Sequence, residues 1–454
     1  MPPGKKPLDM LTSQPGLDLL QEALNHLGNG FAGLPPAETP LELERLRPVL
    51  LEVAERMRDN YPYHHPLYAG QMLKPPHPVA RLAYALAQFI NPNNHALDGG
   101  RASSALEKEA VAEIAAMLGW TTHLGHLTSG GTFANLEGLW IAGQLHPGKR
   151  ILASSQAHYT HQRICGVLQI PFDSLGVDGA ARIDLTGLEE ELAKGDVGTV
   201  VVTLGTSAVG AVDPLHEILP LARRYGARVH GDAAYGGYFR LSQQLSGQAA
   251  RAFEAFPELD SLALDPHKHG MQPYGCGSIL FRDPEVGRFY KHDSPYTYFS
   301  SNELHLGEIS LECSRAGASA VALWATQRLL PLVKGGELGQ RLDKSLAAAR
   351  ALAQWLKERP QQWRLLYEPE LDLVVWAAQG QSASEVSLRS QQIFERAAEL
   401  DLHLAVTQVS QGLVWPELNW DVPRLACLRS CLMKPEHLEW LPQICSRLEQ
   451  ASIQ

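Results

Sequence analysis

The 454-residue sequence has few cysteines, and none of them is arranged as in a zinc finger or a disulfide framework. Cys427 and Cys431 are four residues apart, but no second pair of Cys or His at zinc-finger spacing accompanies them. No C-x-x-C pair occurs anywhere in the chain. We therefore expect reduced, mostly buried thiols, a cytoplasmic protein, and no metal.

The sequence also lacks a long hydrophobic run. Its longest uncharged apolar stretch, residues 197–212, is interrupted by Gly198, Gly205 and Gly210 and is too short to span a bilayer. Residues 1–11 carry two lysines but no apolar segment after them. We expect neither a secretory signal of the usual form nor a membrane partner.

An excess of positive charge is missing as well. The 39 Lys and Arg residues are outnumbered by 49 Asp and Glu residues, which gives a formal net charge of −10. This balance argues against nucleic acid as the main partner, although a local basic pocket could still hold a small anion. A hydrophobic content of 45% with 19% charged residues excludes disorder throughout the chain.

The middle of the chain alternates short β-branched runs with helical patterns. Strands are predicted at residues 150–154, 199–204, 227–231, 261–264 and 277–281, with helices between several of them. Such alternation predicts an α/β fold with a mainly parallel sheet flanked by helices. Residues 311–330 are predicted to form a long helix that leads out of this region. The domains expected are an N-terminal segment (1–95), a large domain (96–335) and a smaller C-terminal α+β domain (336–454).

The N-terminal region carries weaker signals. Residues 41–60 have helical periodicity, whereas the aromatic and Pro-rich residues 61–78 predict an ordered extended segment. Ser104 and Glu107 match a capping box, which predicts that a helix begins at Ser104 and ends at Gly119.

Four groups of candidate catalytic or ligand-binding residues each follow a predicted strand. In open α/β sheets, ligands bind at the carboxyl ends of the strands. Ser129, Gly130, Gly131 and Thr132 precede a helical run and are able to cradle an anion at the helix N-terminus. Taken alone, the same residues more often form an ordinary turn or helix cap.

The other three groups are single side chains. Asp232 follows a predicted strand and could pair with a ring nitrogen cation or only cap a turn. Lys268, beside His267 and His269, could supply a neutral amine for Schiff-base chemistry or be a solvated charge. His158 could stack on a flat heteroaromatic ring or be an ordinary histidine. Together the four groups are the parts needed to hold pyridoxal 5′-phosphate.

At this point the sequence resembles the group II pyridoxal-phosphate-dependent amino-acid decarboxylases, which act on glutamate, aromatic amino acids, tyrosine or diaminobutyrate. The resemblance extends from about residue 60 to the C-terminus. It rests on His65-Pro66, Tyr68-Ala69-Gly70-Gln71, Ser129-Gly130-Gly131-Thr132, His158, Leu204-Gly205-Thr206, His230-Gly231-Asp232-Ala233-Ala234-Tyr235-Gly236-Gly237 and Asp265-Pro266-His267-Lys268. It implies a fold-type I enzyme that removes the α-carboxylate of an L-amino acid as CO2.

The resemblance also implies roles for individual residues. Lys268 corresponds to the Schiff-base lysine, Asp232 to the partner of the pyridine nitrogen, and His158 to the residue stacked on the ring, with Ala234 on the opposite face. The phosphate contacts correspond to Ser129, Gly130, Gly131, Thr132 and His267. Thr206 would lie near the cofactor's phenolic oxygen or the substrate carboxylate. Arg429 is similar to the arginine that binds the substrate α-carboxylate, although a surface role at a strand edge is an equal alternative.

Two features depart from the pattern. Many relatives have Asn three residues before the lysine, where this chain has Asp265. Tyr296 and Tyr298 both stand where relatives carry a loop with a proton-donating Tyr, and either could be the acid.

Other interpretations remain open from sequence alone. A carbon–carbon lyase or an aminotransferase would share the Asp and Lys pair, and a non-catalytic relative could keep the same architecture. The resemblance further implies a homodimer whose active sites are shared between subunits.

Overall fold

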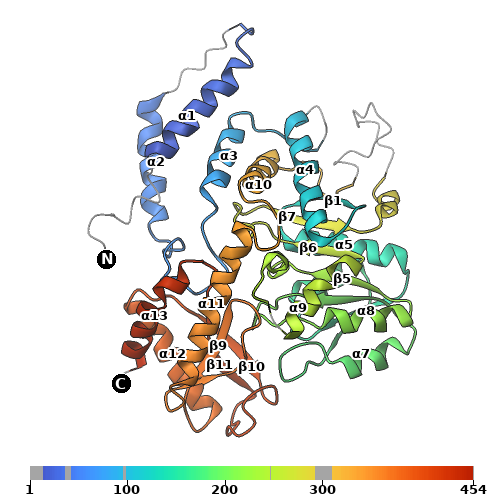
Figure 1. The fold of residues 1–454 in the computed structure, drawn as a ribbon, viewed down its shortest axis with the longest axis vertical. Helices are drawn as coiled ribbons and strands as arrows, with labels where there is room; N and C mark the ends of the chain where they lie inside the picture. The colour runs from blue at the N-terminus through green and yellow to red at the C-terminus, as the bar shows by residue number, and fades with distance from the viewer. Residues whose placement is uncertain (1–13, 36–41, 96–98, 246, 292–308, 453–454) are drawn as a thin grey trace.

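A computed structural model describes residues 14–35, 42–95, 99–245, 247–291 and 309–452. The tyrosines expected to include the proton donor, Tyr296 and Tyr298, lie outside these residues. The described residues form two sheet-based domains and an N-terminal region that extends beyond them (Figure 1). No helix among the described residues has the length and apolar character needed to cross a membrane.

The large domain is built on a seven-stranded sheet in the order β1-β7-β6-β5-β4-β2-β3. Neighbouring strands from β3 through β6 are parallel, and β7 is antiparallel to both β6 and β1. The mainly parallel α/β sheet expected from the sequence is therefore confirmed. The strands are β1 (Leu124–Thr128), β2 (Arg150–Ser154), β3 (Phe172–Leu175), β4 (Val197–Thr203), β5 (Arg228–Asp232), β6 (Ser261–Leu264) and β7 (Gly277–Phe281).

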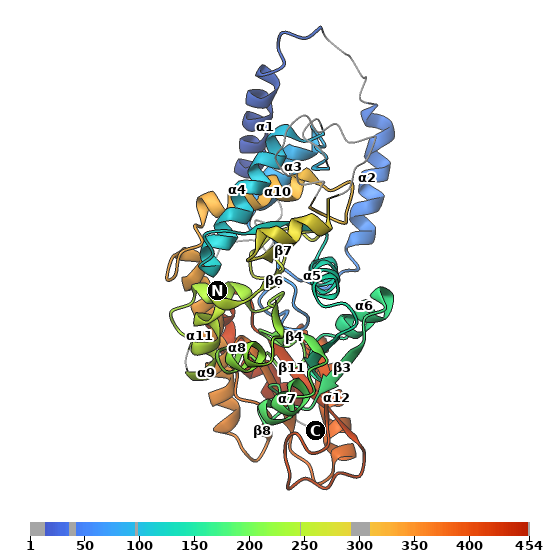
Figure 2. The ribbon, with the colours of Figure 1, turned by 90° about the vertical axis from the view of Figure 1, so that its right-hand side faces the viewer.

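Helices cover both faces of this sheet, so inner strands such as β4 are buried on both sides (Figures 1 and 2). Within β4, Val200 and Val202 pack in the core cluster that includes α4 and α8, whereas Val201 packs in the cluster that includes α5 and α6. The helices around the sheet are α3 (Pro78–Gln88), α4 (Arg101–Leu118), α5 (Gly131–Leu145), α6 (Thr160–Leu168), α7 (Leu185–Leu192), α8 (Leu215–Arg224), α9 (Gly247–Glu254) and α10 (Gly317–Leu329).

The C-terminal part folds as the expected smaller α+β unit. Its four-stranded antiparallel sheet has the order β10-β11-β9-β8, and Trp363 and Trp376 are among its fully buried side chains. Its elements are α11 (Glu337–Lys357), β8 (Trp363–Leu365), β9 (Leu373–Ala378), α12 (Ala383–Glu399), β10 (Ala405–Ser410), β11 (Arg424–Cys431) and α13 (His437–Ser452).

The capping box expected at Ser104 is wrong. Helix α4 begins earlier, at Arg101 after the N-cap residue Gly100, and the Ser104 amide donates to the Gly100 carbonyl inside the helix. Glu107 is buried and binds the Arg315 guanidinium at 2.6 Å and the Leu127 amide at 2.9 Å. The Glu107 carboxylate therefore forms a tertiary ion pair instead of the helix cap that the local sequence predicted. The long helix expected from residue 311 also begins later than predicted, as α10.

The N-terminal region contains two helices, α1 (Gln14–Asn29) and α2 (Leu43–Met57), in which no residue is buried. Figure 2 shows the two helices apart from each other, α1 on the left and α2 on the right. The segment that follows is not extended throughout as expected, because it makes turns over residues 63–67 and bends over residues 70–72. Its middle part is buried against the small domain of the same chain. There the Ala69 amide donates to the His403 carbonyl, and the Cys431 amide donates to the Ala69 carbonyl.

Candidate functional site

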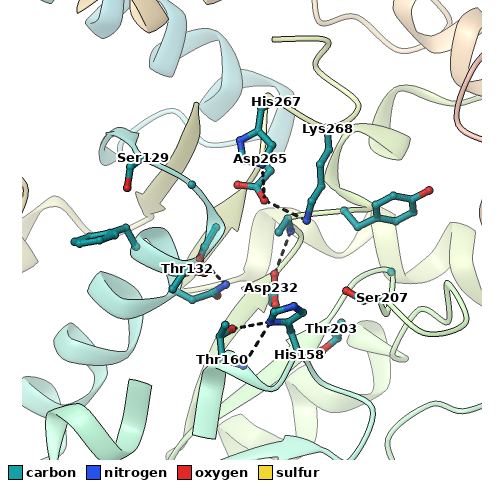
Figure 3. Close-up of a pocket in the computed structure, with 17 residues that line it drawn as sticks. Ser129, Thr132, His158, Thr160, Thr203, Ser207, Asp232, Asp265, His267 and Lys268 are labelled. Atoms are coloured by element: carbon teal, nitrogen blue, oxygen red, sulfur yellow. Dashed lines mark hydrogen bonds and ion pairs between the residues drawn. The ribbon is translucent and has the colours of Figure 1, made fainter. Parts of the chain in front are cut away.

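A pocket of about 310 Å³ opens where strands β4, β5 and β6 of the large sheet end. Because parallel strands place their carboxyl ends at one edge, loops that are far apart in sequence meet there. Nine of the residues singled out from sequence line this pocket (Figure 3): Ser129, Gly130, Gly131, Thr132, His158, Asp232, Ala234, His267 and Lys268.

The first wall of the pocket is the N-terminus of α5. The helix begins at Gly131 directly after β1, so its first backbone N–H groups have no partner within the helix and carry partial positive charge. A Cβ atom on Gly131 would lie 2.8 Å from Asp265 Oδ2, which explains why this position needs glycine. The Ser129 and Thr132 hydroxyl groups border the same corner. This corner is suited to a small anion such as a phosphate group.

Lys268 lies in the turn that follows β6. The turn is held by a hydrogen bond from the Lys268 amide to the Asp265 carbonyl, and Lys268 Nζ is 3.2 Å from Asp265 Oδ2 (Figure 3). His267 Nε2 is 3.5 Å from the same oxygen. The carboxylate of Asp265 therefore holds the amine at the pocket wall.

Asp232 is the last residue of β5 and is 6% exposed. Its Oδ1 accepts a hydrogen bond from the Ala234 amide at 3.2 Å, and its Oδ2 is 2.9 Å from His161 Nε2. Burial alone would raise the pKa of this carboxyl, but the bond and charge of His161, together with the charge of Lys268, hold that pKa well below its usual range. Asp232 is therefore a fixed negative charge at neutral pH.

His158 lies half-buried at the pocket edge, before α6. Its Nδ1 is 2.9 Å from the Thr160 hydroxyl group, which fixes the orientation of the ring (Figure 3). Burial lowers the pKa of His158, and Lys268 adds to this effect while Asp232 opposes it. The imidazole is then neutral at neutral pH, and a neutral flat ring can stack on a second ring.

Arg429 and Thr206 do not line the pocket. Arg429, on β11 of the small domain, is 8% exposed and donates to the Ser207 carbonyl at 2.5 Å and to Gln71 Oε1 at 2.8 Å. Its Nε has no hydrogen-bond partner among the described residues. The Thr206 hydroxyl group is buried and accepts from the Ala211 amide, while its neighbours Gly205 and Ser207 reach the pocket.

Sequence reasoning missed several residues of the site. Thr160, Thr203, Asn135 and Ser207 line the pocket, and His161 lies directly behind Asp232. The spacing of Thr160 from His158 and the position of Thr203 at a strand end were the available signals. The contact of His161 with Asp232 joins residues 71 positions apart, so no local pattern reports it.

A buried polar cluster lies behind Lys268. The Tyr235 hydroxyl group, which lines the pocket, donates to Asp372 Oδ1 at 2.5 Å, and His269 Nε2 is 3.4 Å from Asp372 Oδ2. Burial raises the pKa of Asp372 to about 6, although the Tyr235 hydrogen bond and the charge of Lys74 oppose this effect. Asp372 directly precedes β9, so the cluster joins the pocket to the small domain.

The residues of the pocket fit pyridoxal 5′-phosphate. Its phosphate needs an anion cradle, its ring nitrogen a carboxylate, and its carbonyl carbon an amine, and the pocket presents the α5 N-terminus, Asp232 and Lys268. Three buried polar atoms of the pocket, Thr203 Oγ1, Asp265 Oδ1 and His267 Nδ1, have no hydrogen-bond partner among the described residues and are able to contact a ligand. Among the described residues there is no cluster of side chains suited to a metal ion.

Comparison with known proteins agrees with this chemistry. Residues 144–379 match the family model described as "Pyridoxal-dependent decarboxylase conserved domain". The chain is 27% identical to the L-tyrosine decarboxylase of Enterococcus faecium over 464 residues, which covers 78% of this chain and 76% of the relative. It is 26% identical to the L-aspartate decarboxylase of Thermococcus kodakarensis over 347 residues, which covers 75% and 87%.

The fold has counterparts among solved structures. The structure of Oryza sativa TDC with PLP and tryptamine superposes on this chain with a TM-score of 0.78. Its identity to this chain is 16%, and the match covers 99% of this chain and 100% of that one. At this level of identity the likeness shows the fold alone.

Proposed function

Because the chain belongs to the pyridoxal-dependent decarboxylase family, we propose that the pocket around Lys268 is where it removes the α-carboxylate of an L-amino acid. The chain is a pyridoxal-phosphate-dependent amino-acid decarboxylase, because it matches that family model and its named relatives are amino-acid decarboxylases. The observation that supports the location is the meeting of Lys268, Asp232, His158 and the α5 N-terminus in one pocket.

We assign the central roles as follows. Lys268 supplies the amine that holds the cofactor covalently, and Asp265 keeps that amine at the pocket wall. Asp232 places a fixed negative charge beside the ring nitrogen and favours its protonated form. His158 covers one ring face and Ala234 the other. The chemistry that the bound cofactor supplies is an electron sink for the pair released when CO2 leaves.

The phosphate contacts in this proposal are Ser129, Gly130, Gly131, Thr132 and His267. Backbone N–H groups at the start of α5 bind the phosphate oxygens, and the hydroxyl groups add donors. With its phosphate and ring nitrogen both held by these residues, a bound cofactor would keep one orientation in the pocket. The orientation of the substrate would then decide which of its bonds breaks.

Arg429 is the candidate for that orientation. Its buried guanidinium is held by Ser207, a pocket residue, and its Nε remains free of a partner among the described residues. An arginine in this state can bind the α-carboxylate of the substrate. Thr206 lies in the same loop as Ser207 and helps to fix its course. Proton return to Cα is assigned to Tyr296 or Tyr298.

We also propose a homodimer with shared active sites. In α1 and α2 no residue is buried, and apolar side chains such as Leu50, Leu51 and Met57 are more than 60% exposed. Several exposed apolar side chains on neighbouring helical turns indicate a surface that packs on a partner protein. In this proposal the N-terminal segment (residues 1–95) packs on the second subunit through α1 and α2, since residues 67–69 and α3 already pack within the same chain. Residues 96–335 bind the cofactor, and residues 336–454 form the small domain.

Assembly can be measured directly. Sedimentation equilibrium should give about 100 kDa for the dimer and about 50 kDa for a monomer. A monomer that remains fully active at nanomolar concentration would contradict the shared site.

A cytoplasmic location is also proposed, since all six cysteines are free and five of them are buried.

A panel of L-amino acids scored by CO2 release tests the function. We expect CO2 and the corresponding amine from at least one amino acid, and none with the Lys268→Ala variant. An aldehyde product would instead indicate a carbon–carbon lyase, and a keto acid an aminotransferase. Absence of cofactor absorbance at about 420 nm in the loaded protein would indicate a non-catalytic relative.

A further inference from the structure

His161 is buried directly behind Asp232, on the side away from the pocket. Its side chain is fully buried at the start of α6, and its Nε2 is 2.9 Å from Asp232 Oδ2. The His161 amide donates to the His158 carbonyl, so one turn of chain carries both the ring-stacking candidate and this second histidine. His158 reaches the pocket, whereas His161 reaches only the carboxylate.

The contact constrains both oxygens of Asp232. Because the Ala234 amide binds Oδ1 and His161 binds Oδ2, the plane of the carboxylate is fixed from two sides. In either protonation state of the imidazole, Nε2 carries the hydrogen that Asp232 accepts. The other ring nitrogen, His161 Nδ1, has no partner among the described residues, so nothing there competes for the Nε2 proton.

The neighbouring charged groups leave this role to His161. His230, which lies on β5 two residues before Asp232, contacts Ser261 and Asn135 rather than Asp232. Burial lowers the pKa of His230 to about 3, so it is neutral at neutral pH. Lys268 also faces Asp232, but its amine is held by Asp265 and is reserved for the cofactor.

We propose that His161 is a positioning residue of the decarboxylase, which donates a hydrogen bond to Asp232 and thereby keeps the carboxylate charged and aimed at the ring nitrogen of bound pyridoxal phosphate. Without this bond, the buried carboxylate has one donor fewer and binds a proton more readily. A proton then moves more easily from the ring nitrogen to Asp232, and the ring loses its positive charge. The inference rests on the proposed role of Asp232.

The test measures the protonation of the ring nitrogen itself. Cofactor labelled with ¹⁵N in the ring is bound to the wild-type protein, and its ¹⁵N chemical shift is followed as a function of pH. The same measurement is made with His161→Phe and His161→Leu, which both lack a donor but differ in size, and with His161→Gln, which keeps an N–H group. Having two donor-free variants keeps the test valid when one of them fails to fold.

A control comes from His126, a second fully buried imidazole that lies close to a carboxylate outside the pocket but makes no hydrogen bond among the described residues. Its Nε2 is 3.0 Å from Glu137 Oε2, and neither residue lines the pocket. His126→Gln should therefore bind cofactor with wild-type affinity and an unchanged ¹⁵N signal. This control separates loss of a buried histidine in general from loss of the donor to Asp232.

We expect the donor-free His161 variants to move the ¹⁵N signal toward the unprotonated value at neutral pH. Their affinity for pyridoxal phosphate, measured by equilibrium dialysis, should fall about tenfold or more, and His161→Gln should lie between them and the wild type. An unchanged signal and affinity in the donor-free variants would overturn the inference.

Asp232→Asn distinguishes the two levels of the argument. A shifted signal in Asp232→Asn with an unchanged signal in the His161 variants overturns the role of His161 alone. An unchanged signal in Asp232→Asn overturns the role of Asp232, and the inference on His161 with it.

Discussion

Replacement of Asp372 by Asn should make the protein more stable at neutral pH. The Asp372 carboxyl is fully buried between Tyr235 and His269, and burial raises its pKa from 3.8 to about 6. Burial also lowers the pKa of His269 well below its ordinary value, so this imidazole is neutral and does not compensate a charge on Asp372. The folded protein therefore holds a buried carboxylate above pH 6 at a cost in stability.

The sign follows from proton linkage. Between pH 4 and 6 the folded state binds more protons at Asp372 than the unfolded state does, so the stability contributed by this group is fully present below pH 3.8 and is lost as the pH rises through 6. A difference of about 2.2 pKa units corresponds to about 3 kcal/mol, of which about 2 kcal/mol falls between pH 4.5 and 7.5.

Asparagine fits the same contacts without the charge. Its amide oxygen can accept from the Tyr235 hydroxyl group, and its amide nitrogen would face His269 Nε2, which is 3.4 Å from the present Oδ2 and lacks a partner among the described residues. The Asn variant should therefore gain about 2 kcal/mol over the wild type when the pH is raised from 4.5 to 7.5.

Urea denaturation of the cofactor-free protein at the two pH values measures this difference. Protein concentration must be the same in all samples, since subunit association contributes to apparent stability. Glu190→Gln removes an exposed carboxylate on α7 and should show no such gain. An equal pH dependence in wild type and Asp372→Asn would refute the reasoning and would mean that the charge of Lys74 fully compensates the carboxylate.

Three further predictions concern the pocket. Lys268→Ala should abolish the visible absorbance of the bound cofactor and lower turnover by orders of magnitude, and survival of a tenth of the activity would exclude its role. Gly131→Ala should weaken cofactor binding by about 10- to 100-fold, because the new Cβ meets Asp265 at 2.8 Å, whereas Gly166→Ala meets nothing within 4 Å and should bind normally. Arg429→Leu should raise the substrate KM by about 10- to 150-fold through loss of a charged hydrogen bond, and an unchanged KM would remove it from the substrate site.

The central strands were predictable because their signal is local. The residues 261–264 and 277–281 are short apolar runs bounded by turn residues, and both are strands within the expected limits. The positions of Asp232 and Lys268 at strand ends then followed, since parallel strands bring their carboxyl ends to one edge. Periodicity thus predicted the strand ends, while the residues proposed for the pocket came from the motifs that follow them and from the family resemblance.

Contacts between distant segments were not predictable in this way. Glu107 matched a local cap, yet its carboxylate binds Arg315, which lies 208 residues away. Helix α1 was not predicted either, and none of its residues is buried against the rest of the chain. At Glu107 the deciding interaction is tertiary and overrides a weak local preference.

The pocket also shows why a net acidic protein can bind an anionic cofactor. Each of its two carboxylates lies beside a side-chain nitrogen: Asp265 Oδ2 is 3.2 Å from Lys268 Nζ, and Asp232 Oδ2 is 2.9 Å from His161 Nε2, while Asp265 Oδ1 has no partner among the described residues. The α5 N-terminus then provides the local positive potential at that corner. Because these fields act over a few ångströms and distant charges are screened, the arrangement within the pocket outweighs the net charge of −10.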